Sequence, residues 1–342
     1  MFYNKIQYSY KDITVIPAVI SKIKSRSECN PVCEDGCMPI FTAPMASVVD
    51  TKNYDKWIEN KITPILPRNI QLKDRIFYSK NGNWAAFSLN EFQEFFCNHY
   101  ATNTSEPVWK VLIDIANGHM KCLYDLVRKA KDIHGDKICV MVGNIANPET
   151  YRKCVEAGVW GVRVGVGAGN GCITSSNVSV HYAMGSLIDE TYKVKQRCFA
   201  TGLYQKESLP KIIADGGVRN YSDVIKALAL GADYVMIGSL FASLEESAGK
   251  TTILPNGDKC KEFYGMASKQ GQIAINGKKT KTSEGISKTL PIIGTIPQWS
   301  DNMNAYLRSA MSYCNVEEIK DFNPENVNTA VLSCGASGSI NK

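Results

Sequence analysis

Residues 211–239, KIIADGGVRNYSDVIKALALGADYVMIGS, form the stretch of sequence that decides the fold. Two short apolar runs, at 211–214 and 234–237, are separated by a segment, 222–230, with the pattern of an amphipathic helix. The runs are rich in Val and Ile, as strands buried on both faces are. Gly231 stands where the helix should stop. The stretch therefore predicts a strand, a crossover helix and a second, parallel strand.

The same alternation of apolar runs and helical segments extends through the preceding sequence. Six further runs lie at residues 39–43, 63–66, 84–88, 111–115, 138–142 and 162–166. Segments 120–133 and 148–156 between them have the spacing of helices. Eight strands alternating with helices predict a closed parallel (β/α)8 barrel, or TIM barrel. An open doubly wound sheet would show the same alternation, but the count of eight and the glycine loops after the last two runs favour the barrel.

Two stretches fall outside this repeat. Residues 244–290 form a polar insertion after the eighth strand, and residues 299–313 then have the pattern of a closing helix. An insertion after a barrel strand opens onto the catalytic end, so 244–290 is predicted to be an active-site flap. Residues 323–342 are predicted to form a loosely ordered tail. No second domain is indicated, and we expect a single catalytic domain over residues 1–342.

The composition of the chain disfavours several classes of protein. With 44% hydrophobic and 21% charged residues, the 342-residue chain is typical of a globular protein. A net charge of +6 without a dense Lys/Arg stripe suits an anionic small molecule better than nucleic acid. No apolar run reaches the roughly 18 residues of a membrane span, and the first residues lack the apolar core of a signal peptide. Twelve scattered cysteines indicate reduced thiols, and we therefore expect a cytoplasmic protein.

The most informative strand end follows the run at 162–166. The glycine-rich sequence GVGAGNG, residues 165–171, leads directly into Cys172, and Thr174 lies two residues further on. Glycines allow positive φ angles and close ligand approach, and successive N–H groups can bind an anion. Most cysteines are inert small hydrophobic residues. At the end of a barrel strand, among backbone dipoles, a thiol can instead act as a nucleophile, and we favour that interpretation for Cys172.

Glycine-containing loops also follow the last two strands. They are Asp215-Gly216-Gly217 and Gly238-Ser239. Barrels commonly bind phosphate at these two loops through backbone amides. Asp215 carries the same sign of charge as a phosphate, so the expected partner of its carboxylate is a ribose diol. The alternative is that both loops are ordinary glycine turns.

Five ordered motifs around Cys172 resemble those of the IMP dehydrogenase/GMP reductase family. They are G-x-G-x-G-x-x-C-x-T at 165–174, IADGG at 213–217, VMIGS at 235–239, YGMAS at 264–268 and SEG at 283–285. The resemblance covers roughly residues 8 to 320. It implies that Cys172 attacks C2 of a purine nucleotide and forms a covalent thioimidate. It also implies that Thr174 and Glu284 relay protons to the leaving ammonia.

The resemblance further implies which residues bind the ligands. The substrate residues are Asn170, Asp215, Gly216, Gly217, Gly238, Ser239, Gly265, Met266, Ser268 and Gly285. The cofactor residues, some reaching across a subunit boundary, are Ser25, Arg26, Asp114, Ile115, Ala116, Ser309 and Ser312. Gly167 and Gly169 correspond to a potassium site. Members of the family are usually homotetramers, so a homotetramer is expected.

Three features resemble the reductase branch, which expels ammonia from GMP and takes a hydride from NADPH. Residues 24–28 read KSRSE, and residues 114–118 read DIANG. The segment 269–283 contains neither Arg nor Tyr, whereas the dehydrogenase hydrolyses its intermediate with an Arg-Tyr pair on this flap. The reductase performs no hydrolysis and does not need that pair. The resemblance therefore implies NADPH-dependent conversion of GMP to IMP.

Other positions depart from the reductase pattern. Asn170 stands where a phosphate-binding serine is usual, and Ser175-Ser176 stand where Thr-Arg is usual, which weakens the potassium site. Gly238-Ser239 is closer to the dehydrogenase. Two alternatives stay open: an IMP dehydrogenase with an atypical flap, and a divergent or non-catalytic barrel that binds a purine nucleotide. An aldolase is disfavoured because no strand end carries a lysine for a Schiff base.

Overall fold

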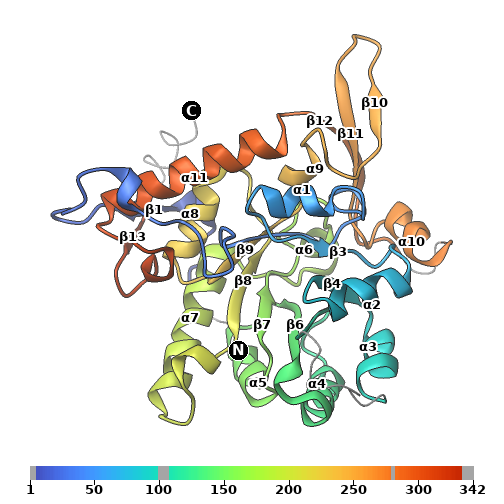
Figure 1. The fold of residues 1–342 in the computed structure, drawn as a ribbon, viewed down its shortest axis with the longest axis horizontal. Coiled ribbons are helices and arrows are strands. Elements are labelled where there is room, and N and C mark those ends of the chain that lie inside the picture. Colours follow the sequence, from blue (N-terminus) through green and yellow to red (C-terminus); the bar gives the residue numbers. More distant parts are fainter. Residues whose placement is uncertain (1–4, 99–107, 279–281, 333–342) are drawn as a thin grey trace.

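The computed structural model describes residues 5–98, 108–278 and 282–332. Eight parallel strands form its central sheet, in the order β2-β9-β8-β7-β6-β5-β4-β3 (Figure 1). The strands are β2 (Ile40–Thr42), β3 (Ile65–Leu66), β4 (Trp84–Phe87), β5 (Trp109–Asp114), β6 (Ile138–Ile145), β7 (Gly161–Val164), β8 (Lys211–Asp215) and β9 (Tyr234–Ile237). Each lies on one of the eight predicted apolar runs, so the strand predictions are confirmed.

The sheet closes on itself between its first and last strands. Phe41 of β2 forms a parallel bridge with Thr63, just before β3. The N–H of Thr42 donates to the carbonyl of Thr63 at 3.0 Å, and the N–H of Thr63 donates to the carbonyl of Ile40 at 3.0 Å. These contacts join the two edges that an open doubly wound sheet would leave apart. The (β/α)8 barrel is therefore confirmed.

Helices cover the outside of the barrel (Figure 1). They are α1 (Tyr54–Glu59), α2 (Leu72–Lys80), α3 (Leu89–Phe96), α4 (Lys121–His134), α5 (Tyr151–Glu156), α7 (Met184–Ala200), α8 (Tyr221–Ala229), α9 (Ser239–Ala242) and α11 (Ile296–Tyr313). The short helix α6 (Thr174–Val178) lies in the loop after β7. The predicted helices at 120–133, 148–156 and 222–230 correspond to α4, to α5 with its preceding 3-10 turn, and to α8. The predicted closing helix is α11, which begins earlier than expected because Thr295 caps it.

Large aromatic side chains block the end of the barrel where the strands begin. The rings of Phe41 and Tyr234 lie 5.0 Å apart, and those of Trp84 and Trp160 lie 4.8 Å apart. Phe41 and Trp84 are almost completely buried, with Leu112 beside them in the same interior cluster. Because this end is filled with side chains, the barrel is a packed core, and its interior is closed to ligands from this end.

The insertion after β9 forms a small antiparallel sheet with one helix. Its order is β10-β11-β12, with β10 at Thr251–Ile253, β11 at Lys259–Tyr264 and β12 at Ser287–Pro291. Helix α10 (Lys269–Asn276) connects β11 to the rest of the insertion, and residues 279–281 lie outside the described residues. Figure 1 shows the hairpin of β10 and β11 projecting away from the barrel. The predicted flap after the eighth strand is therefore present.

The segment predicted as a loose tail is partly ordered. Strand β13 (Asn328–Val331) pairs antiparallel with β1 (Ile13–Ile16) near the other end of the chain. For these residues the prediction was wrong, because the partner strand is more than 300 positions away and local sequence does not reveal it. Val327, just before β13, is buried. Residues 333–342 of the predicted tail lie outside the described residues.

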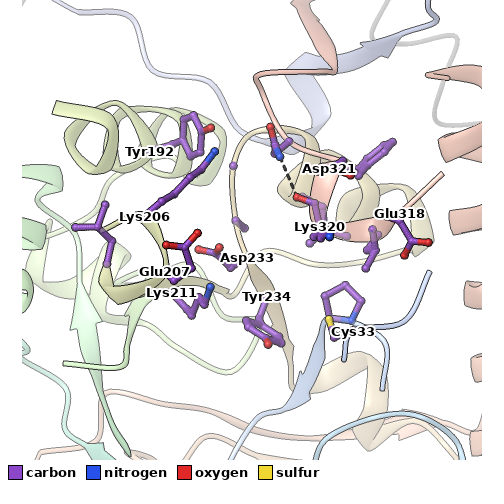
Figure 2. Close-up of a pocket in the computed structure, with 18 of the residues that line it drawn as sticks. Cys33, Tyr192, Lys206, Glu207, Lys211, Asp233, Tyr234, Glu318, Lys320 and Asp321 are labelled. Atoms are coloured by element: carbon purple, nitrogen blue, oxygen red, sulfur yellow. Dashed lines mark hydrogen bonds between the residues drawn. The ribbon is translucent and has the colours of Figure 1, made fainter. Parts of the chain in front are cut away.

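A second hollow lies at the end of the barrel where β8 and β9 begin (Figure 2). It measures about 850 Å³ and shares no lining residue with the cavity around Cys172. Lysine and carboxylate side chains line it, among them those of Lys206, Glu207 and Lys211. Lys195 pairs with Asp233 at 2.7 Å, and Lys206 pairs with Glu325 at 2.9 Å. These charges are already matched within the protein.

Candidate active site

The glycine-rich loop after β7 turns sharply beneath the end of β8. Gly165 has a φ of +138°, a conformation that side-chain-bearing residues rarely adopt. A Cβ atom at this position would lie 2.1 Å from the carbonyl oxygen of Asp215. The glycine is therefore required for close contact between the two loops. The loop then leads through Cys172 into α6, which begins at Thr174.

The flap holds the cysteine loop by backbone pairing. Cys172 forms an antiparallel bridge with Gly285, and the N–H of Ile173 donates to the carbonyl of Glu284 at 3.0 Å. The N–H of Glu284 in turn donates to the carbonyl of Ala267, at the other side of the flap, at 3.1 Å. The segment 284–286 is thus extended and pairs with the cysteine loop on one side and with Ala267 on the other. It places Glu284 beside a cysteine that is 112 positions earlier in the chain.

Cys172, Thr174 and Glu284 form a continuous hydrogen-bond chain. The thiol of Cys172 donates to Oγ1 of Thr174 at 3.1 Å, and that hydroxyl donates to Oε2 of Glu284 at 3.0 Å. All three side chains are half-buried and line one cavity. A chain of this kind can carry a proton from the thiol to the carboxylate and back. The structure thus brings together the three residues that the sequence proposed as catalytic.

A buried arginine connects two carboxylates at the floor of the cavity. Arg163 of β7 is 7% exposed. Its Nη1 donates to Asp114 at 2.7 Å, and its Nε and Nη2 both donate to Oδ2 of Asp215, at 3.0 and 2.8 Å. Burial opposes the positive charge, but the two carboxylates outweigh it and hold the pKa of Arg163 above its usual range. The network fixes the loop after β5 relative to the loop after β8.

Asn144 completes the network around Asp215. Its Nδ2 donates to Oδ2 of Asp215 at 2.6 Å and to the carbonyl of Gly165 at 2.8 Å. Oδ2 of Asp215 therefore accepts three hydrogen bonds from two residues, Arg163 and Asn144. Within the described residues, no side chain engages the other oxygen, Oδ1. An oriented carboxylate with one open oxygen suits the ribose diol that the sequence suggested for it.

His119 occupies the rim of the same cavity. Its Nε2 accepts a hydrogen bond from the N–H of Ala146 at 3.1 Å, so the ring hydrogen lies on Nδ1, 3.0 Å from Oγ1 of Thr150. Burial lowers the pKa of this imidazole. The side chain is therefore neutral and holds the loop after β6, without contributing a charge to the cavity.

The cavity around Cys172 measures about 770 Å³, within the range of about 300 to 1,000 Å³ of small-molecule sites. Most of the proposed ligand residues line it, and each belongs to a loop at the carboxyl end of a barrel strand or to the flap. They are Asp114, Ala116, Gly167, Gly169, Asn170, Asp215, Gly216, Gly217, Gly238, Ser239, Gly265, Met266 and Gly285. Asp114 and Ala116, two of the proposed cofactor residues, thus line the same cavity as Cys172.

Several proposed residues do not reach this cavity. Ser268 is buried, and its hydroxyl accepts from the N–H of Gly271 at 3.1 Å, which caps α10. The hydroxyl of Ser268 is therefore used by the helix cap, and a substrate contact at this residue stays a prediction. Ile115 is likewise absent from the lining residues. Its backbone is used instead to pair with the strand end of β6.

The remaining proposed cofactor residues gather at a different surface. Ser25 and Arg26 line a shallow hollow of about 480 Å³ beside α11, together with Arg308. Ser309 and Ser312 lie on the same helix, close to Arg308. The guanidinium of Arg308 donates to backbone carbonyls of the turn that contains Arg26. Within one chain, these four residues are separate from the cavity around Cys172.

The proposed potassium ligands have a specific structural role. Gly167 has a φ of +72°, and its carbonyl accepts a hydrogen bond from Oγ of Ser175 at 3.1 Å. Ser175 follows Thr174, at the point where the sequence departs from the usual family pattern. The hydroxyl thus uses a carbonyl that a cation would need. Potassium binding at Gly167 and Gly169 stays a prediction.

Four residues at or behind the cavity escaped the sequence reasoning. Arg163, Phe263 and Arg219 line the cavity, and Lys288 lies behind it on β12. An arginine between two valines of a buried strand was the one available signal, because a charged residue inside such a run needs partners. The other three lie where only the folded flap and loops bring them close. No local pattern in the sequence marks them.

The comparisons with known proteins agree with this geometry. Residues 97–339 match the family model described as the IMP dehydrogenase / GMP reductase domain. The chain belongs to the IMP dehydrogenase/GMP reductase family. Its members are oxidoreductases of purine metabolism, which bind purine nucleotides and use a nicotinamide cofactor.

Three curated relatives are named GMP reductase. The protein from Staphylococcus epidermidis is 31% identical over 325 residues, which cover 92% of this chain and 93% of the relative. The proteins from Bacillus licheniformis and Lysinibacillus sphaericus are each 32% identical over 324 residues, or 90% of both chains. The resemblance proposed from the motifs around Cys172 is thus confirmed at the level of the family. No helix in the described ranges is both long and apolar enough to cross a membrane.

Proposed function

We propose that this protein converts GMP to IMP and ammonia, with consumption of NADPH, through a covalent bond between Cys172 and C2 of the purine. The observation that carries the proposal is the hydrogen-bond chain from Cys172 through Thr174 to Glu284. Attack by sulfur splits the replacement of an amine by hydrogen into two easier steps. The relatives named GMP reductase, similar over about nine tenths of the chain, support the same reaction.

In the first step, Sγ of Cys172 forms a bond to C2. The thiol proton moves to Oγ1 of Thr174 while the hydroxyl proton of Thr174 moves to Oε2 of Glu284. The C2–N bond then breaks, and the leaving nitrogen takes this proton back from Glu284 through Thr174 as it departs as ammonia. The product of this step is a thioimidate between Cys172 and the purine.

In the second step, C2 exchanges its bond to sulfur for a bond to hydrogen. When bound, the nicotinamide supplies the hydride that C2 receives. Sulfur leaves C2 with the bonding electrons, and Cys172 regains its proton from solvent or from the relay. Asp114, held by Arg163 at the cavity floor, would orient the cofactor ribose, and Asp215 would orient the nucleotide ribose through its open Oδ1.

IMP dehydrogenase is the main alternative, because Gly238-Ser239 resembles that branch. Its reaction ends with hydrolysis of the covalent intermediate, which requires a group that activates water. The flap segment 269–283 contains neither Arg nor Tyr. Glu284 lies beside Cys172, but in the proposed reaction it is occupied with the leaving amine. The flap composition therefore favours reduction.

The proposed function includes three finer statements that the family resemblance suggests. The cofactor is NADPH and not NADH, with Arg26 as the candidate partner of its 2′-phosphate. The assembly is a homotetramer, in which Ser25, Arg26, Ser309 and Ser312 would reach a neighbouring subunit's cavity. The protein works in the cytoplasm, in keeping with its cysteines: those among the described residues are all free thiols.

The test follows the absorbance of reduced nicotinamide in two mixtures, GMP with NADPH and IMP with NAD. We expect the absorbance to fall in the first mixture, with release of one ammonia per NADPH consumed. A rise in the second mixture would make the protein a dehydrogenase. The variant Cys172→Ala should lose turnover while retaining IMP binding, because its hydrogen-bond partners and the cavity wall stay in place. Turnover in that variant would rule out the covalent mechanism.

A further inference from the structure

The phosphate end of the cavity has an unusual side chain. Asn170 projects from the glycine loop toward Gly238-Ser239, and its Nδ2 lies 3.5 Å from Oγ of Ser239. Its Oδ1 accepts a hydrogen bond from Nζ of Lys288 at 2.9 Å. Lys288 belongs to β12 of the flap, 118 positions away in the chain. The pair thus joins the glycine loop to the flap on the side where a phosphate is expected.

Lys288 is held in place by an aromatic ring. It pairs across the flap sheet with Phe263 of β11, and its Nζ lies 5.7 Å from the centroid of the Phe263 ring. Phe263 is 2% exposed and lines the cavity. A cation over a ring face is favourable by about 0.5 to 2 kcal/mol. Within the described part of the chain, no carboxylate lies in ion-pair contact with Lys288, so its charge is available to a ligand.

The charges of the cavity wall show why such a cation is needed. Three carboxylates line it, from Asp114, Asp215 and Glu284, against two guanidinium groups, from Arg163 and Arg219. Arg163 is fully used by Asp114 and Asp215. A nucleotide phosphate would add about two negative charges to this wall. A further positive charge close by would favour its binding.

We propose that Lys288, acting with Asn170, is the cation that selects a nucleotide over a nucleoside at this site. This inference rests on the proposed function, because it assumes that the cavity binds a purine ribonucleotide. Asn170 presents Nδ2 beside Ser239, while its Oδ1 anchors the lysine. The ammonium group of Lys288 would attract the phosphate without touching it, because Asn170 lies between them.

The test compares IMP with inosine, which differ only in the phosphate. Calorimetric titration of Lys288→Met should show about tenfold weaker binding of IMP and unchanged binding of inosine. Lys288→Arg should retain most of the affinity for IMP, because it keeps the charge. Lys259→Met is the matched control, since Lys259 lies exposed in the same flap sheet near Glu245. It should bind both ligands as the wild type does.

Each other outcome has a defined meaning. Equal weakening of IMP and inosine in Lys288→Met would show that the lysine only supports the flap, and unchanged IMP binding would show that its charge is not used. Either result overturns this inference while leaving GMP reduction intact. If the wild-type protein binds neither IMP nor GMP, the proposed function fails, and the inference fails with it.

Discussion

Replacement of Arg163 by Met tests the network that holds the two halves of the site together. Arg163 is 7% exposed, and its guanidinium makes three hydrogen bonds to Asp114 and Asp215. Removing one partner of a buried ion pair costs about 3 to 5 kcal/mol, because the remaining charge stays buried without compensation. Here two carboxylates would be left facing each other. We therefore expect the free energy of unfolding to fall by about 4 kcal/mol.

The assay is urea denaturation followed by tryptophan fluorescence, arranged as a double-mutant cycle with Asp114→Asn. Charge-assisted hydrogen bonds contribute about 1.5 to 3 kcal/mol each. The cycle should therefore give a coupling energy of about 2 kcal/mol between Arg163 and Asp114. Arg152→Met is the control, because Arg152 makes a surface ion pair with Glu149. That pair should contribute less than about 1 kcal/mol to the free energy of unfolding.

Two results would refute this reasoning. One is a loss in Arg163→Met no larger than the loss in Arg152→Met. The other is a coupling energy below about 0.5 kcal/mol, the usual error of additivity. Either would mean that water reaches the carboxylates and compensates them. The site would then be held by the backbone contacts of the flap and the glycine loop alone.

Three further predictions concern the relay, the glycine loop and an ion pair outside the site. Glu284→Gln should lower kcat by about 100-fold or more, because the amide cannot take the relayed proton. The KM for the nucleotide should stay nearly unchanged. Steady-state kinetics that show a change in KM alone would contradict the relay. Gly165→Ala should lower the midpoint of thermal unfolding much more than Gly202→Ala does. A Cβ at 165 would lie 2.1 Å from the carbonyl oxygen of Asp215, whereas a Cβ at 202 would meet nothing within 4 Å. Equal midpoints for the two variants would show that the glycine loop relaxes around the added methyl group. Burial raises the pKa of Glu91, but Arg75 and the helix cap at Ser88 outweigh it and lower that pKa to about 2. The variant Glu91→Gln should therefore lower the free energy of unfolding by about 3 kcal/mol at neutral pH. That stabilisation is complete above the unfolded pKa of about 4.5 and is lost as the pH falls toward 2. Denaturation at pH 7 and pH 3 checks it, and a cost independent of pH would refute it.

The barrel could be predicted from the sequence because its signals are local. Each strand is a short apolar run buried on both faces, and helices such as α4 carry their own periodicity. Closure between β2 and β3 was inferred less directly, from the count of eight strands and the glycine loops after the last two. The pairing of β1 with β13 was not predictable in the same way, because neither strand has a strong pattern of its own and each depends on a distant partner.

The site residues also differ in whether a local sequence signal or a distant partner determines their position. Cys172 and Thr174 belong to one loop, whose glycine-rich sequence indicated a reactive thiol, and the family resemblance implied the relay through Thr174. Lys288 gave no signal, since a lysine in a polar flap is ordinarily a solvated surface residue. The substrate contact at Ser268 stays a prediction from its motif, and the sequence did not reveal that its hydroxyl caps α10. Motifs mark which segments meet, but packing decides which side chains face the cavity.

The pairing of β1 with β13 has a consequence for how the chain matures. Residues 13–16 are translated more than 300 positions before their partner residues, 328–331. Strand β1 therefore stays unpaired while all eight barrel strands, which lie between it and β13 in the sequence, are translated and can already associate. Closing so long a loop is slow and is governed by chain entropy. The two-stranded sheet of β1 and β13 should accordingly form as a late step, which seals a barrel already assembled.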